Sequence, residues 1–113
     1  MGKIIKGYKA FNKGMKCRDK QYAENTTFEE NAIKLYEKGM HFCEKPLDVL
    51  NHYPLVNEKG EISEFAEVEA PQNLCDIGDN EICTKKLKIK SKISFSKLVE
   101  LAVDFDYMKI IND

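Results

Sequence analysis

The most constraining feature of this sequence is a turn followed by a proline-bounded segment in the middle of the chain. Gly39 separates two short apolar runs, residues 32–36 and 40–43, and glycine adopts the positive φ that a tight turn needs. Pro46 stands where the first residue of a helix would stand, because that position has no intrahelical partner for an N–H group. Pro54 disfavours helix in the residue before it. The stretch therefore predicts a strand, a turn, a strand and a short helix.

Three further segments alternate apolar and polar residues with the period of two that β-strands show. They are residues 4–11, 62–70 and 82–93, and the last keeps its alternation through its second half without a break. Ser94 then predicts the N-cap of an amphipathic helix of about three turns, because a serine oxygen accepts a hydrogen bond from the first helical turn. Residues 104–113 form a tail expected to dock as a last strand or turn.

The order of these segments favours an α+β fold over a repeated βαβ array, because the links between them are irregular and of hairpin length. Residues 15–22 are polar and irregular, and residues 24–31 are expected to form a loop or a single turn. The predicted fold is one domain over residues 1–113. It has a curved, mostly antiparallel or mixed sheet of about five strands with two short helices. The core is expected to hold Leu47, Leu50, Phe65, Val68, Leu87, Ile89, Phe95, Leu98 and Leu101.

The composition is that of an ordinary globular protein. The chain has 113 residues, of which 42% are apolar and 33% charged, and its net charge is −1. Such a charge creates no field that would attract nucleic acid as a whole. No apolar run approaches the ~18 residues of a membrane span, and the first residues lack the pattern of a signal peptide. We therefore expect a cytoplasmic protein with no membrane partner and with reduced cysteines, none of which forms a C-x-x-C metal pair.

Several motifs are spread over most of the chain. They are Gly7-Tyr8-Lys9-Ala10-Phe11-Asn12, Cys17-Arg18, Gln21-Tyr22, Gly39-Met40-His41-Phe42-Cys43 with Pro46-Leu47-Asp48-Val49-Leu50 and Tyr53, and Phe65-Ala66-Glu67-Val68-Glu69-Ala70. Together they resemble an uncharacterised domain of phage and prophage proteins. In that family the domain often precedes an array of short glycine-aspartate-rich repeats. The resemblance implies a phage or prophage product that acts in the cytoplasm of a bacterial host.

The central segment is also similar to the strand–helix segment of the ADP-ribosyltransferase superfamily. There a glycine leads into a short strand, and a short helix ending in tyrosine follows. The resemblance implies that Tyr8 or Arg18 contacts nicotinamide dinucleotide (NAD), the substrate. It assigns the late-strand glutamate, Glu69 or its neighbour Glu67, to the stabilisation of the oxocarbenium-like state. The hypothesis requires that Tyr8, Arg18, His41 and Glu69 converge in one cleft.

A second catalytic possibility is a histidine–cysteine pair. His41 and Cys43 lie two residues apart on one predicted strand, and an imidazole can activate a thiolate. Side chains on one face of a strand point in parallel, however, and the sequence offers no third group to orient the imidazole. The pair is therefore expected to have a packed or hydrogen-bonded structural role.

Four lysines, Lys86, Lys88, Lys90 and Lys92, are expected to share one face of a late strand. Their repeat of about 6.7 Å is close to the spacing of phosphates along a nucleic-acid strand. Two structural interpretations compete with binding to a nucleic-acid backbone. The lysines could protect an exposed sheet edge, or they could pair with Glu67 and Glu69 on a neighbouring strand. A further polar run, residues 76–81, lacks the spacing of a calcium loop and predicts a solvated turn.

These observations favour a small non-enzymatic interaction module encoded by a phage, with a host or phage protein as its partner. Inhibition of a bacterial defence system, as anti-CRISPR proteins achieve, is the concrete form of this hypothesis. The alternatives are the ADP-ribosyltransferase-like enzyme, which would use NAD, and the nucleic-acid-binding lysine face. The first hypothesis predicts that an outer surface meets the target. A deep hollow lined by ionisable side chains from distant parts of the chain would contradict it.

Overall fold

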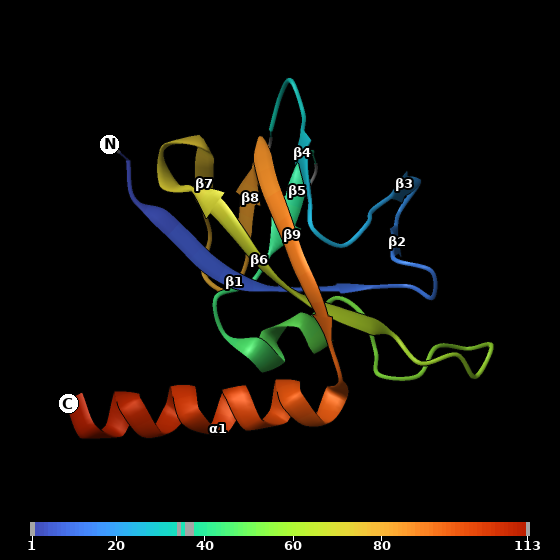
Figure 1. Cartoon of the computed structure of the whole chain (residues 1–113), viewed down its shortest axis with the longest axis vertical. Coiled ribbons are helices and arrows are strands. Elements are labelled where there is room, and N and C mark those ends of the chain that lie inside the picture. Colours follow the sequence, from blue (N-terminus) through green and yellow to red (C-terminus); the bar gives the residue numbers. More distant parts are fainter. Residues whose placement is uncertain (1, 34, 36–37, 113) are drawn as a thin grey trace.

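The computed structural model describes residues 2–33, 35 and 38–112. Its largest sheet is antiparallel and has the order β1-β6-β9-β4. These strands span Ile4–Phe11 (β1), Glu64–Pro71 (β6), Lys86–Ile93 (β9) and Thr26–Glu29 (β4). Figure 1 shows that the sheet is strongly twisted.

A second, three-stranded antiparallel sheet packs against one face of the first. Its order is β5-β8-β7, and its strands span Met40–Phe42, Ile82–Thr84 and Cys75–Ile77 respectively. Apolar side chains from both sheets form one core cluster. Its largest fully buried members include Phe11, Phe42, Met40, Leu87 and Ile89.

The other face of the large sheet is covered by helices. The 3-10 helix η1 (Pro46–Asn51) supplies Val49, and the α-helix α1 (Phe95–Asn112) supplies Leu98. Together with Phe65 they form a second core cluster. Figure 1 shows α1 running along the lower side of the molecule, below η1. Alternate side chains of one strand of the large sheet therefore pack into two different cores.

Two strands from different sheets touch at the middle of β1. The amide of Tyr8 donates to the carbonyl oxygen of Cys43 (2.7 Å), and the Cys43 amide donates to Tyr8 (2.9 Å). Gly7 allows this approach, because a Cβ there would collide with the Cys43 carbonyl oxygen. Gly39 has a φ of +99°, as its place in a tight turn requires.

The expected α+β class and the mostly antiparallel pairing are confirmed, but the expected single sheet of about five strands is wrong. Residues 16–21 form a hairpin of β2 (Lys16–Cys17) and β3 (Lys20–Gln21). Residues 24–31 contain β4, and residues 72–80 contain the 3-10 helix η2 (Gln72–Leu74) and β7. The strand expected over residues 32–36 does not form at Ala32, Ile33 or Leu35; Lys34 and Tyr36 lie outside the described residues.

The helical elements also differ from the prediction. Ser94 caps α1 as expected, since the Lys97 amide donates to its Oγ (3.0 Å). The helix has 18 residues, however, and it includes the segment expected to be a separate tail. Leu47 and Phe95 are exposed rather than in the core, while Leu50 and Leu101 are half-buried. Among the described residues, no helix is long and apolar enough to cross a membrane.

Candidate functional site

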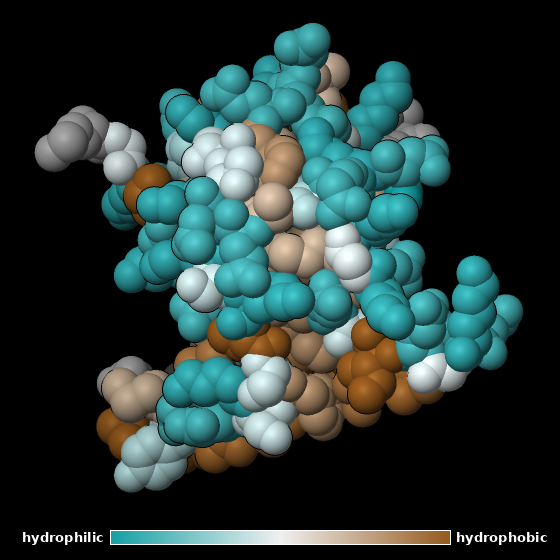
Figure 2. Space-filling view, turned by 45° about the vertical axis from the view of Figure 1, so that its right-hand side comes forward, coloured by the Kyte–Doolittle hydropathy of each residue, from teal (hydrophilic) through white to brown (hydrophobic). Residues whose placement is uncertain are grey.

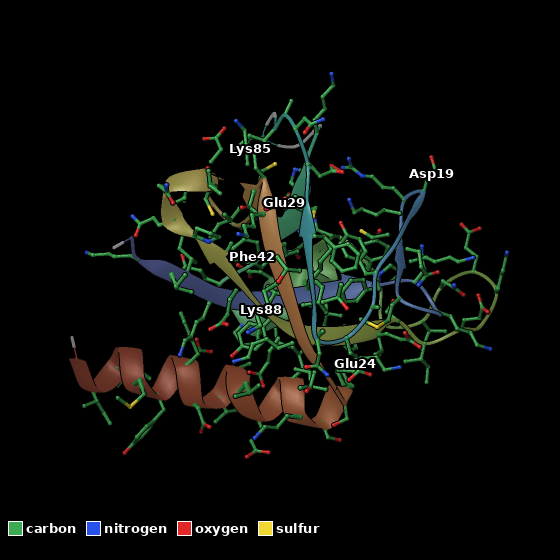
Figure 3. The ribbon with its side chains drawn as sticks, turned by 45° about the horizontal axis from the view of Figure 1, so that its top comes forward. Asp19, Glu24, Glu29, Phe42, Lys85 and Lys88 are labelled. Carbon is green, nitrogen blue, oxygen red and sulfur yellow. The ribbon has the colours of Figure 1, made fainter. Side chains whose placement is uncertain are left out.

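A cavity of about 880 Å³ lies beside β1, bounded by β5, η1 and the β2–β3 hairpin. Side chains that are far apart in the sequence line it. Figure 3 labels two lining residues, Phe42 near the centre of the molecule and Asp19 at the tip of the hairpin. The ionisable side chains of the lining are Tyr8, Lys9, Cys17, Arg18, Asp19, Lys20, Tyr22, Glu30, Lys38, His41, Cys43, His52, Tyr53 and Glu81.

A buried carboxylate between two histidines is the most distinctive group in the cavity. Glu81 is 7% exposed, and it immediately precedes β8. His41 Nε2 lies 3.4 Å from Glu81 Oε1, and His52 Nε2 lies 3.5 Å from Glu81 Oε2. His41 comes from β5, whereas His52 directly follows η1. Three separate segments of the chain thus bring one carboxylate and two imidazoles together, an arrangement that can accept, hold or donate a proton.

The cavity changes the protonation of His41. Burial lowers its pKa below the usual value, while the charge of Glu81 opposes the shift. The positive charges of Lys9 and Arg18 lower the pKa further. This imidazole is therefore held toward its neutral form, in which one ring nitrogen can accept a proton.

Lys9 forms part of the cavity wall and is 4% exposed. Its Nζ donates a hydrogen bond to the carbonyl oxygen of His41 (2.5 Å). Nζ also lies 5.3 Å from the ring centre of Tyr22 and 5.8 Å from that of Phe11. Burial lowers the pKa of this amine, and the nearby Cys17 thiol opposes the shift. No carboxylate of the described residues forms an ion pair with Lys9.

The β2–β3 hairpin closes the cavity with a thiol and the only arginine of the chain. Cys17 Sγ and Tyr53 Oη share a hydrogen bond of 2.8 Å, which ties the hairpin to the residues after η1. Arg18 occupies the hairpin turn with a φ of +56°. That left-handed conformation costs a residue with a Cβ about 1–2 kcal/mol. The strained backbone at Arg18 places the only arginine of the chain in the wall of the cavity.

The cysteine expected to pair with His41 is not suited to be a nucleophile. Burial raises the pKa of the Cys43 thiol to about 12. The negative charges of Asp48 and Glu81 raise it as well. Since the thiolate is the reactive form, Cys43 belongs to the packed core around Val49 rather than to the chemistry of the cavity.

Three of the four residues assigned to the transferase hypothesis converge. Tyr8, Arg18 and His41 line the same cavity. Glu69 does not: it lies opposite Lys88 on β9, and its Oε2 is 3.9 Å from Lys90 Nζ. The four residues therefore do not converge, and the carboxylates that line the cavity are those of Asp19, Glu30 and Glu81.

Glu81 was not predicted to be a buried residue of a site, because it lies in a polar run, residues 76–81, which was expected to be a solvated turn. The only local signal was its position directly before the apolar pair Ile82-Cys83, which begins a buried strand. Lys9 was also missed. It lies among β1 residues that alternate between two cores, so its neighbours in the sequence did not mark its side as buried.

The lysines of β9 do not form one uninterrupted face. The pairing of β6 with β9 shifts between Ala66 and Val68, where β9 contains one extra residue. Ile89 consequently packs in the first core cluster and Ile93 against the second. The strand is also internal to its sheet, so protection of a sheet edge is not its role.

Three of these four lysines lie near carboxylates. Nζ–carboxylate distances are 3.7 Å for Lys86 with Glu29, 3.9 Å for Lys90 with Glu69 and 3.6 Å for Lys92 with Glu64. Pairing with a glutamate of a neighbouring strand is thus confirmed for Glu69, whereas Glu67 is not among these partners. Nucleic-acid binding through this strand stays a prediction. Within the described parts of the chain, no three His, Cys, Asp or Glu side chains meet in a way that could hold a metal ion.

The model of a family described as a domain of unknown function, DUF7666, matches residues 5–101. No match was found among curated proteins or among solved structures.

Proposed function

We propose that this chain, which belongs to the DUF7666 family, is an enzyme that binds NAD in the cavity and transfers ADP-ribose to a macromolecule. The cavity carries the proposal, because Tyr8, Arg18 and His41 line it together with the buried carboxylate of Glu81. Its volume of about 880 Å³ lies within the range of small-molecule sites. The same hollow favours binding inside the molecule over contact through an outer surface alone.

Each group has a role in this reaction. The bond between the ribose carbon and nicotinamide breaks, nicotinamide leaves with the electron pair, and positive charge develops on the ribose. The carboxylate of Glu81 stabilises that charge, and a water-poor environment strengthens the interaction. Arg18 is suited to the pyrophosphate, since a guanidinium can donate two parallel hydrogen bonds. The acceptor group attacks the ribose carbon and passes its proton to the Glu81–histidine cluster.

The setting we propose is that of a phage or prophage product acting in a bacterial cytoplasm, as a single domain over residues 1–113. The support is the resemblance of its motifs to phage and prophage proteins. In this setting the acceptor would be a macromolecule of the host.

A matched pair of glutamate variants tests the enzyme. The wild-type chain is incubated with NAD labelled in its adenylate part and with bacterial lysate, and label on macromolecules is measured. Glu81→Gln should reduce transfer by at least about a hundredfold, the usual effect of removing one electrostatic contact to a transition state. Glu69→Gln removes a carboxylate from the surface and should leave transfer within twofold of wild type. Absence of label with the folded wild-type chain, or equal loss in both variants, would contradict the proposal.

A second candidate is the interaction module expected from the sequence, in its concrete form an inhibitor of a host defence protein. The outer side of α1 favours it. Figure 2 shows apolar side chains gathered along the lower side of the molecule, where α1 lies. Val103, Tyr107, Ile110 and Ile111 are each more than half exposed.

Substitutions on α1 separate this candidate from the enzyme. Val103→Asp should abolish capture of one stoichiometric partner from host lysate, because it places a charge in the apolar surface. Glu100→Ala, on the same helix, should retain capture. Under this candidate the wild-type chain leaves no label from NAD on protein. Capture that is unchanged by Val103→Asp would exclude α1 as the interface.

A further inference from the structure

The environment of the Lys9 amine differs from that of the lysines that form ion pairs in the described part of the chain. It is almost completely buried, yet no carboxylate of the described residues lies within ion-pair distance. Its Nζ donates a hydrogen bond to the carbonyl oxygen of His41, and the Cys17 side chain is a second hydrogen-bond partner. A charged ammonium in such a place is costly, because these two partners do not replace its hydration.

Two aromatic rings shield the amine. The ring centres of Tyr22 and Phe11 lie 5.3 and 5.8 Å from Nζ. Their π faces offset part of the cost of burying a charge, but burial prevails and lowers the pKa of the amine. Lysines that are desolvated beside other cationic groups are those that act as nucleophiles toward carbonyl compounds.

The space next to Lys9 can hold a small anionic ligand. Lys9 lines the cavity together with Arg18 and His52, and a cavity of about 880 Å³ exceeds the volume of a small carbonyl compound. Arg18 brings a permanent positive charge to the same wall. Glu81 lies between the two histidines of the same cavity and provides a group that can take up or return the proton of an adding amine.

We propose that Lys9 is a covalent binding site for a small aldehyde that carries a carboxylate or phosphate group. The neutral amine adds to the carbonyl carbon, a C–N bond forms and the C=O π electrons move to oxygen. Loss of water then leaves an imine, with the proton transfers handled at the Glu81–histidine cluster. The reaction is reversible and needs no oxidant or reductant. It is independent of NAD, so its failure leaves the proposed transferase untouched.

Reductive trapping on the full-length chain tests this site. Glyoxylate is the probe, and cyanoborohydride delivers hydride to the imine carbon so that a stable carboxymethyl-lysine remains. Peptide mapping by mass spectrometry then compares Lys9 with Lys88, an exposed lysine of β9, as the internal reference. At pH 7, Lys9 should be labelled at least tenfold faster than Lys88. At pH 10 the ratio should fall, because the exposed amine also loses its proton.

Two controls identify the chemistry. Acetaldehyde, which has no charge, should give a smaller ratio of Lys9 to Lys88 labelling than glyoxylate if the cations of the cavity draw in the anion. Lys9→Arg should remove the fast label and leave slow labelling of exposed lysines. The wild-type ratio needs no variant, so a folding defect in Lys9→Arg would not prevent the test. Labelling of Lys9 that is no faster than that of Lys88 at pH 7 would overturn the proposal.

Discussion

Lys9 on β1 and Lys90 on β9 belong to the same sheet, but the two strands place them in opposite environments. Lys9 is 4% exposed and faces rings and a carbonyl oxygen. Lys90 has a side chain that is 41% exposed and lies 3.9 Å from Glu69. At the surface, water and salt screen the charge, and such pairs contribute little to stability. In the cavity, burial lowers the pKa of the lysine amine.

The same contrast separates the two glutamates that were candidates for chemistry. Glu69 is one member of a screened surface pair. Glu81 is buried and its two oxygens face two imidazoles. Groups with strongly altered environments cluster where chemistry occurs. The comparison is therefore the reason that the proposed chemistry uses the cavity beside β1 rather than β9.

The largest expected difference between cavity and surface concerns thiol reactivity. With a pKa of about 12, the thiolate of Cys43 is about 10⁻⁴ of the population at pH 8, so alkylation should be about a thousandfold slower than for an ordinary thiol. Mass spectrometry after iodoacetamide treatment of the native chain measures the rate. In guanidinium chloride, Cys43 should react at the ordinary rate. Fast labelling of native Cys43 would show that this wall of the cavity is open.

The next largest effect concerns the packing of the cavity wall. Phe42 is fully buried and contributes both to the core and to the cavity lining. Phe42→Ala should lower the free energy of unfolding by about 3–5 kcal/mol. The control is Leu47→Ala in η1, which is 41% exposed and should cost less than about 0.5 kcal/mol. Denaturant unfolding measures both, and equal losses would contradict the burial described for the two sites.

A smaller effect arises from the buried imidazole. The pKa of His41 is lower in the folded chain than in the unfolded one, so the unfolded chain takes up this proton first as pH falls. Stability from this group is complete above the unfolded pKa of about 6.5. It declines below that pH until the folded pKa is passed, with a slope of at most about 1.4 kcal/mol per pH unit. His41→Gln should flatten this part of the stability profile. A variant profile as steep as that of wild type would assign the dependence to another group.

The smallest effect is expected on β9. Lys90→Ala removes one long, partly exposed ion pair with Glu69 and should change the unfolding free energy by no more than about 0.5 kcal/mol. High salt should erase even this difference. A loss above 1 kcal/mol that persists in salt would mean that the β9 pairs are structural, and it would weaken the contrast with the cavity.

Several elements were predictable because their signals are local. The first strand was expected over residues 4–11 and forms over Ile4–Phe11. Pro46 begins η1, and Ser94 caps α1. In each case a few neighbouring residues carry the physical cause: alternation, a missing N–H group or a capping oxygen. Of the residues named in the transferase hypothesis, Tyr8, Arg18 and His41 line one cavity and Glu69 does not, and their catalytic role stays a prediction.

Other features depend on partners elsewhere in the chain. The alternation in residues 86–93 suggested one lysine face, but an extra residue in β9 relative to β6 moves Ile93 to the other core. The short strands β2, β3 and β4 carry polar residues and are ordered by pairing, not by an apolar pattern. Helix α1 continues past its buried turns with exposed apolar residues, which local periodicity assigned to a separate tail.

The sequence by itself determined the turns, the caps, the first strand and the α+β class, because those follow from backbone preferences and short-range periodicity. Only the tertiary structure decided which ionisable residues line one cavity. Lys9, His41, His52 and Glu81 come from four segments, and each would be solvated in isolation. They meet because β1, β5, η1 and the start of β8 surround one hollow, where partial burial reduces the screening of one charge from another by water.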